Sequence, residues 1–200
     1  MRTIIGLTGG IATGKTTVTN YLASNYKLPI FDADIYARDA VEIGSPVLQE
    51  LTQRYGADIL LDDGSLNRPK LARIIFTKKS DRSFVEGLIH PYVRQRFQEA
   101  IETSLESIIV LAIPLLFEAN LTNFVTETWV VYCNQEQQIL RLMQRDNLTQ
   151  EEAVAIIGIQ MPLAEKVARA DIVLDNSSTL IELLKQIDDI FKAYNHVYRF

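Results

Sequence analysis

The stretch "LTGGIATGKTTV" at residues 7–18 decides the fold predicted for this chain. Within it, Gly9 to Thr16 fit the pattern G-x-x-x-x-G-K-[ST]. The apolar run "TIIGLT" (3–8) before it is typical of a buried strand, and "GKTTVTNYLASN" (14–25) after it has helical spacing. Glycines let backbone N–H groups turn around an anion, and the positive end of a helix dipole attracts it. The stretch therefore predicts a phosphate-binding loop.

The loop residues have separate expected roles. Lys15 is expected to reach the β- and γ-phosphates of a nucleoside triphosphate, and the Thr16 hydroxyl is expected to be a ligand of Mg²⁺. The residues expected to bind ATP in this loop are Gly10, Ile11, Ala12, Thr13, Gly14, Lys15, Thr16 and Thr17. The chain has no Asn-Lys-x-Asp motif that would read guanine. ATP is therefore the expected nucleotide.

The third predicted strand favours transfer to an acceptor over hydrolysis. Its apolar run "IIVLAI" (108–113) leads into Pro-Leu-Leu without the acidic residue with which motor ATPases hold Mg²⁺ and a water. Glu118 lies further along the chain and is a poor substitute.

Composition limits the classes of function. The chain has 200 residues, 48% of them hydrophobic, and a net charge of −5, which suits one sizeable domain and argues against a nucleic-acid partner. The lone Cys133 is expected to be a buried packing residue in a reducing cytoplasm. We expect neither a signal peptide nor a membrane span, because no apolar run reaches about 20 residues.

Strands and helices alternate along the chain. Strands are predicted at 3–8, 28–34, 107–114, 126–133 and 170–176, and helical patterns at 14–25, 35–55 with a break at 44–46, 68–77, 81–104, 136–147, 149–158 and 178–194. Thr149 with Glu152 predicts a capping box. This order indicates an α/β fold with a parallel five-stranded sheet flanked by helices. Ligands of such sheets bind beyond the carboxyl ends of the strands.

Two carboxylates follow the second predicted strand. In "FDADIYAR" (31–38), Asp32 and Asp34 are expected to face the same way in an extended segment. One of them would accept a proton from an attacking hydroxyl and help to order Mg²⁺ waters. The alternative is that the pair forms a turn or a helix N-cap. Arg38 either contacts a substrate phosphate or pairs with Asp34.

Cations and a candidate lid come later. Arg141 and Arg145 are spaced i, i+4 on one predicted helix face, where they either clamp the moving phosphate or lie solvated on the surface. The helical stretch that follows is broken by Gly158 and Pro162. It suits a lid that closes over the nucleotide, although packed surface helices would look similar.

Several motifs together resemble one family. They are "GLTGGIATGKTTV", "FDADIYAR", "LLDDGSLNRPKLARIIF", "LIHPYV", "IPLLFEA", "LRLMQRD", "IGIQMP" and "ADIVLDN", found between about residues 4 and 176. In order and spacing they are similar to dephospho-CoA kinases. The resemblance implies transfer of the ATP γ-phosphate, with Mg²⁺, to the ribose 3′-hydroxyl of dephospho-CoA in the final step of coenzyme A synthesis. It also implies a P-loop kinase core (1–59, 105–145 and 167–200), a helical CoA-binding insertion (60–104) and a lid (146–166).

The resemblance also implies roles for individual residues. Asp34 resembles the catalytic base, and Lys15 and Arg141 resemble the residues that steady the transferring phosphate. Arg145 and Asn176 would complete the ATP site, and the acceptor would contact Thr8, Asp32, Arg38, His90, Pro114 and Leu115. For His90, a packed or capping role is the alternative. The expected partners are ATP and dephospho-CoA only, with a monomer or weak homo-oligomer as the assembly.

Two residues depart from the family pattern, and two rival functions remain at this stage. Ala12 stands where many members have glycine, which is tolerable if its φ is negative. Ile156 stands where many have a lid arginine. The first rival is another small-molecule P-loop kinase of the shikimate or gluconate type, although the Gly-Gly-Gly turn of shikimate kinases is missing. The second is a non-catalytic nucleotide-binding regulator, against which the intact Lys15, Thr16, Asp34 and Arg141 argue.

Overall fold

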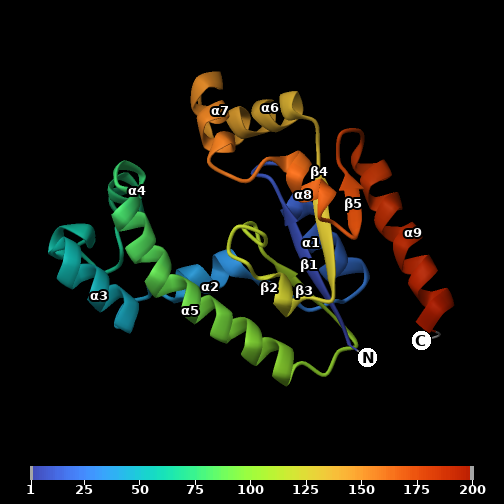
Figure 1. Cartoon of the computed structure of the whole chain (residues 1–200), viewed down its shortest axis with the longest axis horizontal. Coiled ribbons are helices and arrows are strands. Elements are labelled where there is room, and N and C mark those ends of the chain that lie inside the picture. The colour runs from blue at the N-terminus through green and yellow to red at the C-terminus, as the bar shows by residue number, and fades with distance from the viewer. Residues whose placement is uncertain (1, 199–200) are drawn as a thin grey trace. The chain divides into compact units, whose positions relative to one another are not determined.

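The computed structural model describes residues 2–198, and these fall into two compact units (Figure 1). Unit 1 comprises the described residues of 1–31 and 104–200, and unit 2 comprises Asp32–Thr103.

A five-stranded sheet forms the centre of unit 1. Its strands are β1 (Thr3–Gly9), β2 (Ile30–Asp32), β3 (Ile108–Ala112), β4 (Glu127–Tyr132) and β5 (Ile172–Asp175), in the order β2-β3-β1-β4-β5. β1 pairs in parallel with both β3 and β4, so that Ile5 lies between Val110 and Glu127. The residues of β3 are buried throughout, which matches the unbroken apolar run expected of a central parallel strand. The predicted parallel five-stranded sheet is confirmed.

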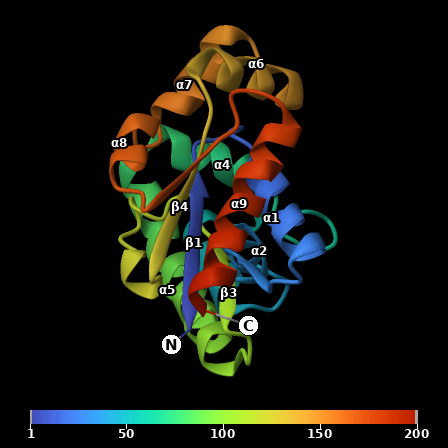
Figure 2. The same ribbon diagram turned by 90° about the vertical axis from the view of Figure 1, so that its right-hand side faces the viewer.

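Helices α1 (Lys15–Asn25) and α9 (Leu180–Tyr198) pack on one face of this sheet (Figure 2). Val18 and Leu22 of α1 and Leu183 of α9 are fully buried in the same core cluster as the β-strand residues Ile5 and Trp129. The other helices of this unit are α6 (Gln135–Asp146), α7 (Gln150–Gly158) and α8 (Leu163–Ala168). α6 and α7 lie beyond the carboxyl ends of the strands in both views, where ligands of such sheets bind (Figures 1 and 2).

Unit 2 contains α2 (Ala33–Asp39), α3 (Pro46–Tyr55), α4 (Arg68–Thr77) and α5 (Lys79–Thr103). Its core cluster consists of Val41, Leu48, Leu51, Ile59, Leu66, Leu71 and Val85. Beside this cluster, the carboxylate of Asp81 accepts hydrogen bonds of 3.1 Å from Arg54 and from the Tyr55 hydroxyl. The Arg54 guanidinium also stacks over the Phe84 ring at 4.2 Å from its centroid.

The second predicted strand is wrong at its C-terminal end. β2 stops at Asp32, and α2 begins at Ala33, so Asp32 and Asp34 do not share an extended segment. Asp32 is the N-cap of α2, and its side chain accepts the N–H of Asp34 at 2.8 Å. An aspartate at this position offers the helix an acceptor for a backbone N–H, and here that local bond prevails over continued extension. The alternative interpretation of Asp32 as a cap is the one that the structure has.

Two other features, the capping box and the buried cysteine, follow the sequence predictions. Thr149 and Glu152 form the predicted capping box at the start of α7. Cys133 is a free, buried thiol, and its burial raises the pKa of the thiol. Over the described part of the chain, no helix has the length and apolarity to cross a membrane.

Candidate active site

The phosphate-binding loop connects β1 to α1 in unit 1. Gly9 ends β1, and Gly14 is the N-cap of α1 with a left-handed φ of 106°. Glycine adopts this φ without the penalty of a side chain. A Cβ atom at Gly14 would also collide with the Asn176 amide. Both reasons require glycine at this position of the motif.

Ala12 also has a left-handed backbone, with φ 61°. Alanine was expected to be tolerable at this position if its φ were negative. The observed φ is positive, so this condition is not met. For a non-glycine residue this conformation costs roughly 1–2 kcal/mol. The loop consequently stores strain at its centre that the surrounding contacts must balance.

Side-chain amides hold the carbonyl oxygens of the loop. The Gln138 Nε2 of α6 donates to the Ile11 carbonyl at 2.8 Å, and the Asn176 Nδ2 donates to the Thr13 carbonyl at 2.8 Å. Gln138 approaches so closely that a Cβ atom at Gly10 would lie 2.6 Å from its Nε2. Carbonyl oxygens that would repel phosphate are thus bonded to protein groups.

One backbone N–H of the loop is also taken by a side chain. The Ile11 N–H donates to the Gln160 Oε1 at 2.8 Å, and Gln160 follows α7 in the candidate lid segment. Neither Gln138 nor Gln160 is among the residues predicted for the site. Their amides are uncharged and 127 and 149 residues from Ile11, so no local pattern marks the pairing.

The expected cations lie on α6. Arg141 donates from Nη2 to the Asn176 carbonyl at 3.0 Å, while its Nη1 is buried and has no hydrogen-bond partner among the described residues. Arg145 forms two bonds of 2.8 Å with the neighbouring Asp146. The structure therefore brings Arg141 and Asn176 together, and it places Arg145 in a local ion pair.

The loop after β3 holds a buried ion pair that sequence reasoning missed. Lys166 of α8 is fully buried, and its Nζ lies 2.9 Å from both the Glu118 Oε1 and the Pro114 carbonyl. The same Pro114 carbonyl accepts the hydroxyl of the buried Thr8 at 3.1 Å. Leu115 follows Pro114 and is half-buried. A lysine in "LAEKVAR" is ordinarily solvated, so its burial left no signal in the sequence.

In unit 2 the expected acceptor residues lie on two helices. Asp34 is in the first turn of α2, and the carbonyl of Arg38 in its last turn accepts a 3.4 Å bond from Arg68. His90 is half-buried in α5, one residue before Pro91. Among the described residues of 2–198, no group of three or more His, Cys, Asp or Glu side chains is placed to hold a metal.

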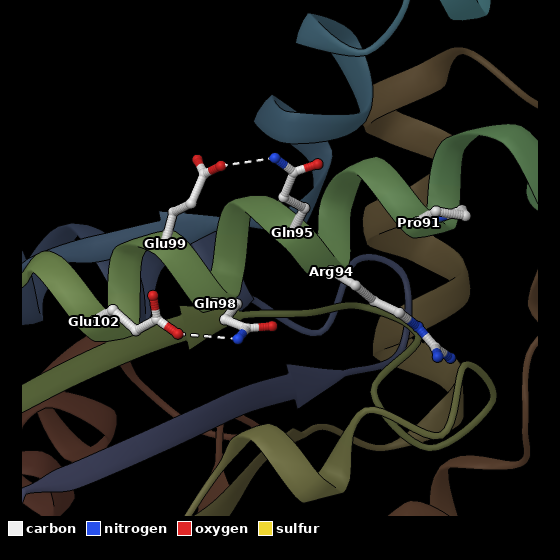
Figure 3. Close-up of a pocket in the computed structure, with 6 residues that line it drawn as sticks. All are labelled: Pro91, Arg94, Gln95, Gln98, Glu99 and Glu102. Atoms are coloured by element: carbon white, nitrogen blue, oxygen red, sulfur yellow. Dashed lines mark hydrogen bonds between the residues drawn. The ribbon is translucent and has the colours of Figure 1, made fainter.

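A hollow of about 560 Å³ runs along α5 (Figure 3). It is lined by Pro91, Arg94, Gln95, Gln98, Glu99 and Glu102. Gln95 and Gln98 each donate a bond of 2.9 Å to the glutamate four residues further on. None of the residues that the sequence analysis proposed for the site lines this hollow.

The parallel sheet, the loop between β1 and α1, and the helices beyond the strand ends define the class of P-loop kinases. A family model described as dephospho-CoA kinase matches residues 3–182. The chain therefore belongs to the dephospho-CoA kinase family. The prediction of a phosphotransferase that performs the last step of coenzyme A synthesis is confirmed.

Named relatives and solved structures agree with this assignment. A dephospho-CoA kinase of Nostoc sp. is 64% identical over 185 residues, which span 92% of this chain and 94% of the relative. A solved Thermus thermophilus protein matches 96% of this chain and 97% of its own, with a TM-score of 0.83 and 32% identity. The dephospho-CoA kinase of Campylobacter jejuni matches 97% of this chain and 100% of its own, with a TM-score of 0.70 and 25% identity.

Proposed function

We propose that this chain transfers the γ-phosphate of ATP to the ribose 3′-hydroxyl of dephospho-CoA and releases coenzyme A and ADP. The observation that carries the donor half is the phosphate loop, whose carbonyl oxygens are bonded by Gln138 and Asn176. The acceptor half rests on membership of the family. The cytoplasm is the proposed location, and a monomer or weak homo-oligomer is the proposed assembly.

The triphosphate would lie against the loop. N–H groups of the loop between Gly10 and Thr17 would bind its oxygens, apart from those of Ile11, Thr13 and Thr17, which donate to protein oxygens. The Lys15 ammonium would stabilise the charge on the γ-phosphate as it moves. The Thr16 hydroxyl would be the protein ligand of Mg²⁺, which neutralises phosphate charge when it is bound. One exposed hydroxyl fits a cation that keeps most of its waters and takes further oxygens from the phosphates.

Arg141 is assigned to the transferring phosphate, and Arg145 and Asn176 are assigned to the remaining contacts with ATP. Arg141 has an unpaired, buried Nη1 beside the Asn176 loop, which leaves one donor for a nucleotide. For Arg145 to reach ATP, it must give up its bonds to Asp146. That exchange of one anionic partner for another keeps its guanidinium paired.

The acceptor chemistry is assigned to Asp34. Its carboxylate would take the proton of the 3′-hydroxyl as the γ-phosphate arrives, since phosphoryl transfer needs a positioned base more than a strong one. Asp32 would serve as the cap that fixes the first turn of α2, where Asp34 lies. Further contacts to dephospho-CoA are proposed for Thr8, Arg38, His90, Pro114 and Leu115. The proposed division is a core, a CoA-binding insertion at 60–104 and a lid at 146–166.

Turnover with a panel of acceptors tests this function. ADP formation from ATP and Mg²⁺ would be followed with dephospho-CoA, shikimate, gluconate or no acceptor, and the product identified by mass spectrometry. We expect rapid ADP release and a product heavier by one phosphate with dephospho-CoA alone. Equal ADP release without an acceptor would mean that the chain is a hydrolase, and turnover with shikimate would assign it to a rival kinase.

A further inference from the structure

We propose that Gln160 is a positioning residue for the phosphoryl donor: with Gln138, it clamps Ile11 and so holds the phosphate loop in the strained form that receives ATP. This inference deepens the proposed function and rests on it, because it takes ATP as the ligand of the loop. Gln160 is not expected to touch the reacting atoms.

Both backbone groups of a single loop residue are held by glutamines. The N–H of Ile11 donates to the Gln160 Oε1 at 2.8 Å, and the carbonyl of Ile11 accepts from the Gln138 Nε2 at 2.8 Å. Gln138 lies in α6, Gln160 follows α7, and these two helices pack against each other. The α6–α7 pair therefore holds Ile11 through its N–H and its carbonyl together.

The clamped residue immediately precedes the strained one. Ala12 has φ 61°, a conformation that persists in a non-glycine residue only when its neighbours over-determine it. On its other side, the carbonyl of Thr13 is held by Asn176, and the Thr13 hydroxyl donates to the Gly10 carbonyl at 2.9 Å. If the clamp on Ile11 were lost, Ala12 would be free to relax and the N–H groups after it would turn.

Gln160 is itself held in place by the next residues of the chain. The N–H of Met161 donates to the Glu118 Oε1 at 3.1 Å, and that oxygen also pairs with the buried Lys166 at 2.9 Å. Lys166 in turn donates to the Pro114 carbonyl at the end of β3. The backbone directly after Gln160 is thus connected, through Glu118 and Lys166, to the segment that follows β3.

Two substitutions of Gln160 remove the side-chain oxygen that accepts the Ile11 N–H, and they do so in different ways. Gln160→Met keeps the length of the side chain, and Gln160→Ala removes it. The matched control is Gln53→Ala, an exposed glutamine of α3 outside the candidate lid. The dissociation constant for Mg·ATP would be measured by calorimetry without acceptor, together with Tm of the free protein and, separately, kcat and KM for ATP.

We expect both Gln160 variants to raise the ATP dissociation constant and KM by about 2- to 12-fold, the usual effect of one lost hydrogen bond, with a smaller change in kcat. Gln53→Ala should equal the parent. The decisive step is to repeat Gln160→Met in an Ala12→Gly background, where the left-handed backbone carries no penalty and the clamp is needed less. There the effect should fall below about twofold.

Two results would overturn the clamp. One is an ATP dissociation constant for both Gln160 variants equal to that of Gln53→Ala, even with a lowered Tm, since Gln160 would then be merely structural. The other is an effect of Gln160→Met that has the same size in the parent and in the Ala12→Gly background. Failure of the proposed function would look different: the parent would bind ATP but form no ADP with dephospho-CoA.

Discussion

The phosphate loop of unit 1 and the helices of unit 2 are stabilised in opposite ways. In the loop, polar backbone groups are held by amide side chains more than 120 residues away in sequence. In unit 2, an apolar cluster joins the helices, and its buried carboxylate, Asp81, is bonded by residues 26 and 27 positions away. We therefore expect substitutions in the loop to affect catalysis first, and substitutions in the helical core to affect stability first.

Asp34 of unit 2 is the residue to which we assign the proton transfer, and its substitution should lower activity the most. Asp34→Asn keeps the shape of the side chain and removes the base, and we expect kcat to fall by roughly 10²–10⁴ with little change in KM for either substrate. Asp32→Asn is the matched control, because asparagine caps a helix as well as aspartate does. Steady-state kinetics at saturating substrates would compare the two. If Asp32→Asn is the inactive variant, the assigned roles are reversed.

Removing the ammonium of the loop should be nearly as severe. Lys15→Ala is expected to lower kcat by about 10²–10³, the usual result of losing a group that stabilises transition-state charge. The fold should persist, because Lys15 lies at the start of α1 and outside the core cluster. Tm and turnover would be measured together with those of Lys185→Ala at an exposed position. Activity within about threefold of the parent would contradict the assignment.

In unit 2, loss of a buried polar partner should lower stability and leave catalysis almost intact. The Arg54 guanidinium bonded to Asp81 holds the pKa of this carboxyl below its usual value. A depressed folded pKa gives stability that is present above the unfolded pKa of about 3.9 and is lost as the pH falls through the folded value. Asp81→Ala should therefore lower Tm at pH 7, and the gap to the parent should close in acid. A gap that is constant with pH would mean that the carboxylate charge contributes nothing.

Closure of the candidate lid over the phosphate loop should have a smaller effect, which hydrogen exchange can detect. If residues 146–166 close over ATP, backbone amides in α7 should exchange hydrogen more slowly with Mg·ATP than without it. Amides next to the buried Lys166 should be protected in both states. Exchange that is identical throughout the segment with and without nucleotide would identify α7 as ordinary packed surface.

The smallest expected effect concerns Ala12. Ala12→Gly relieves a strain of roughly 1–2 kcal/mol but adds up to about 1 kcal/mol of unfolded-chain entropy. The free energy of unfolding should therefore rise by about 0–2 kcal/mol. Ala155→Gly, at an exposed position inside α7, should instead lower it by about 1 kcal/mol. Urea denaturation of both variants would contradict the strain at Ala12 if the two changes had the same sign.

The parts of the molecule that sequence reasoning predicted are those with local signals. The loop motif, the buried strands and the Thr149 capping box each depend on residues close together in the chain. Asp32 was harder to predict, because an aspartate after a strand can belong to an active site or cap a helix. In the structure its side chain accepts the N–H of Asp34, so it is a helix cap. Gln138, Gln160 and Lys166 could not be predicted, because their roles arise only when the sheet brings distant segments together.

The buried ammonium of Lys166 has a consequence for chemical labelling. An amine-directed acylating reagent needs an exposed, deprotonated amine, and Lys166 is shielded completely and bonded to Glu118. Exposed lysines such as Lys185 will react first, and Lys166 will react only while the α8 segment is detached from the sheet. Mass spectrometry can follow the labelling of each lysine separately. The rate at which Lys166 acquires label therefore reports how often the α8 segment opens.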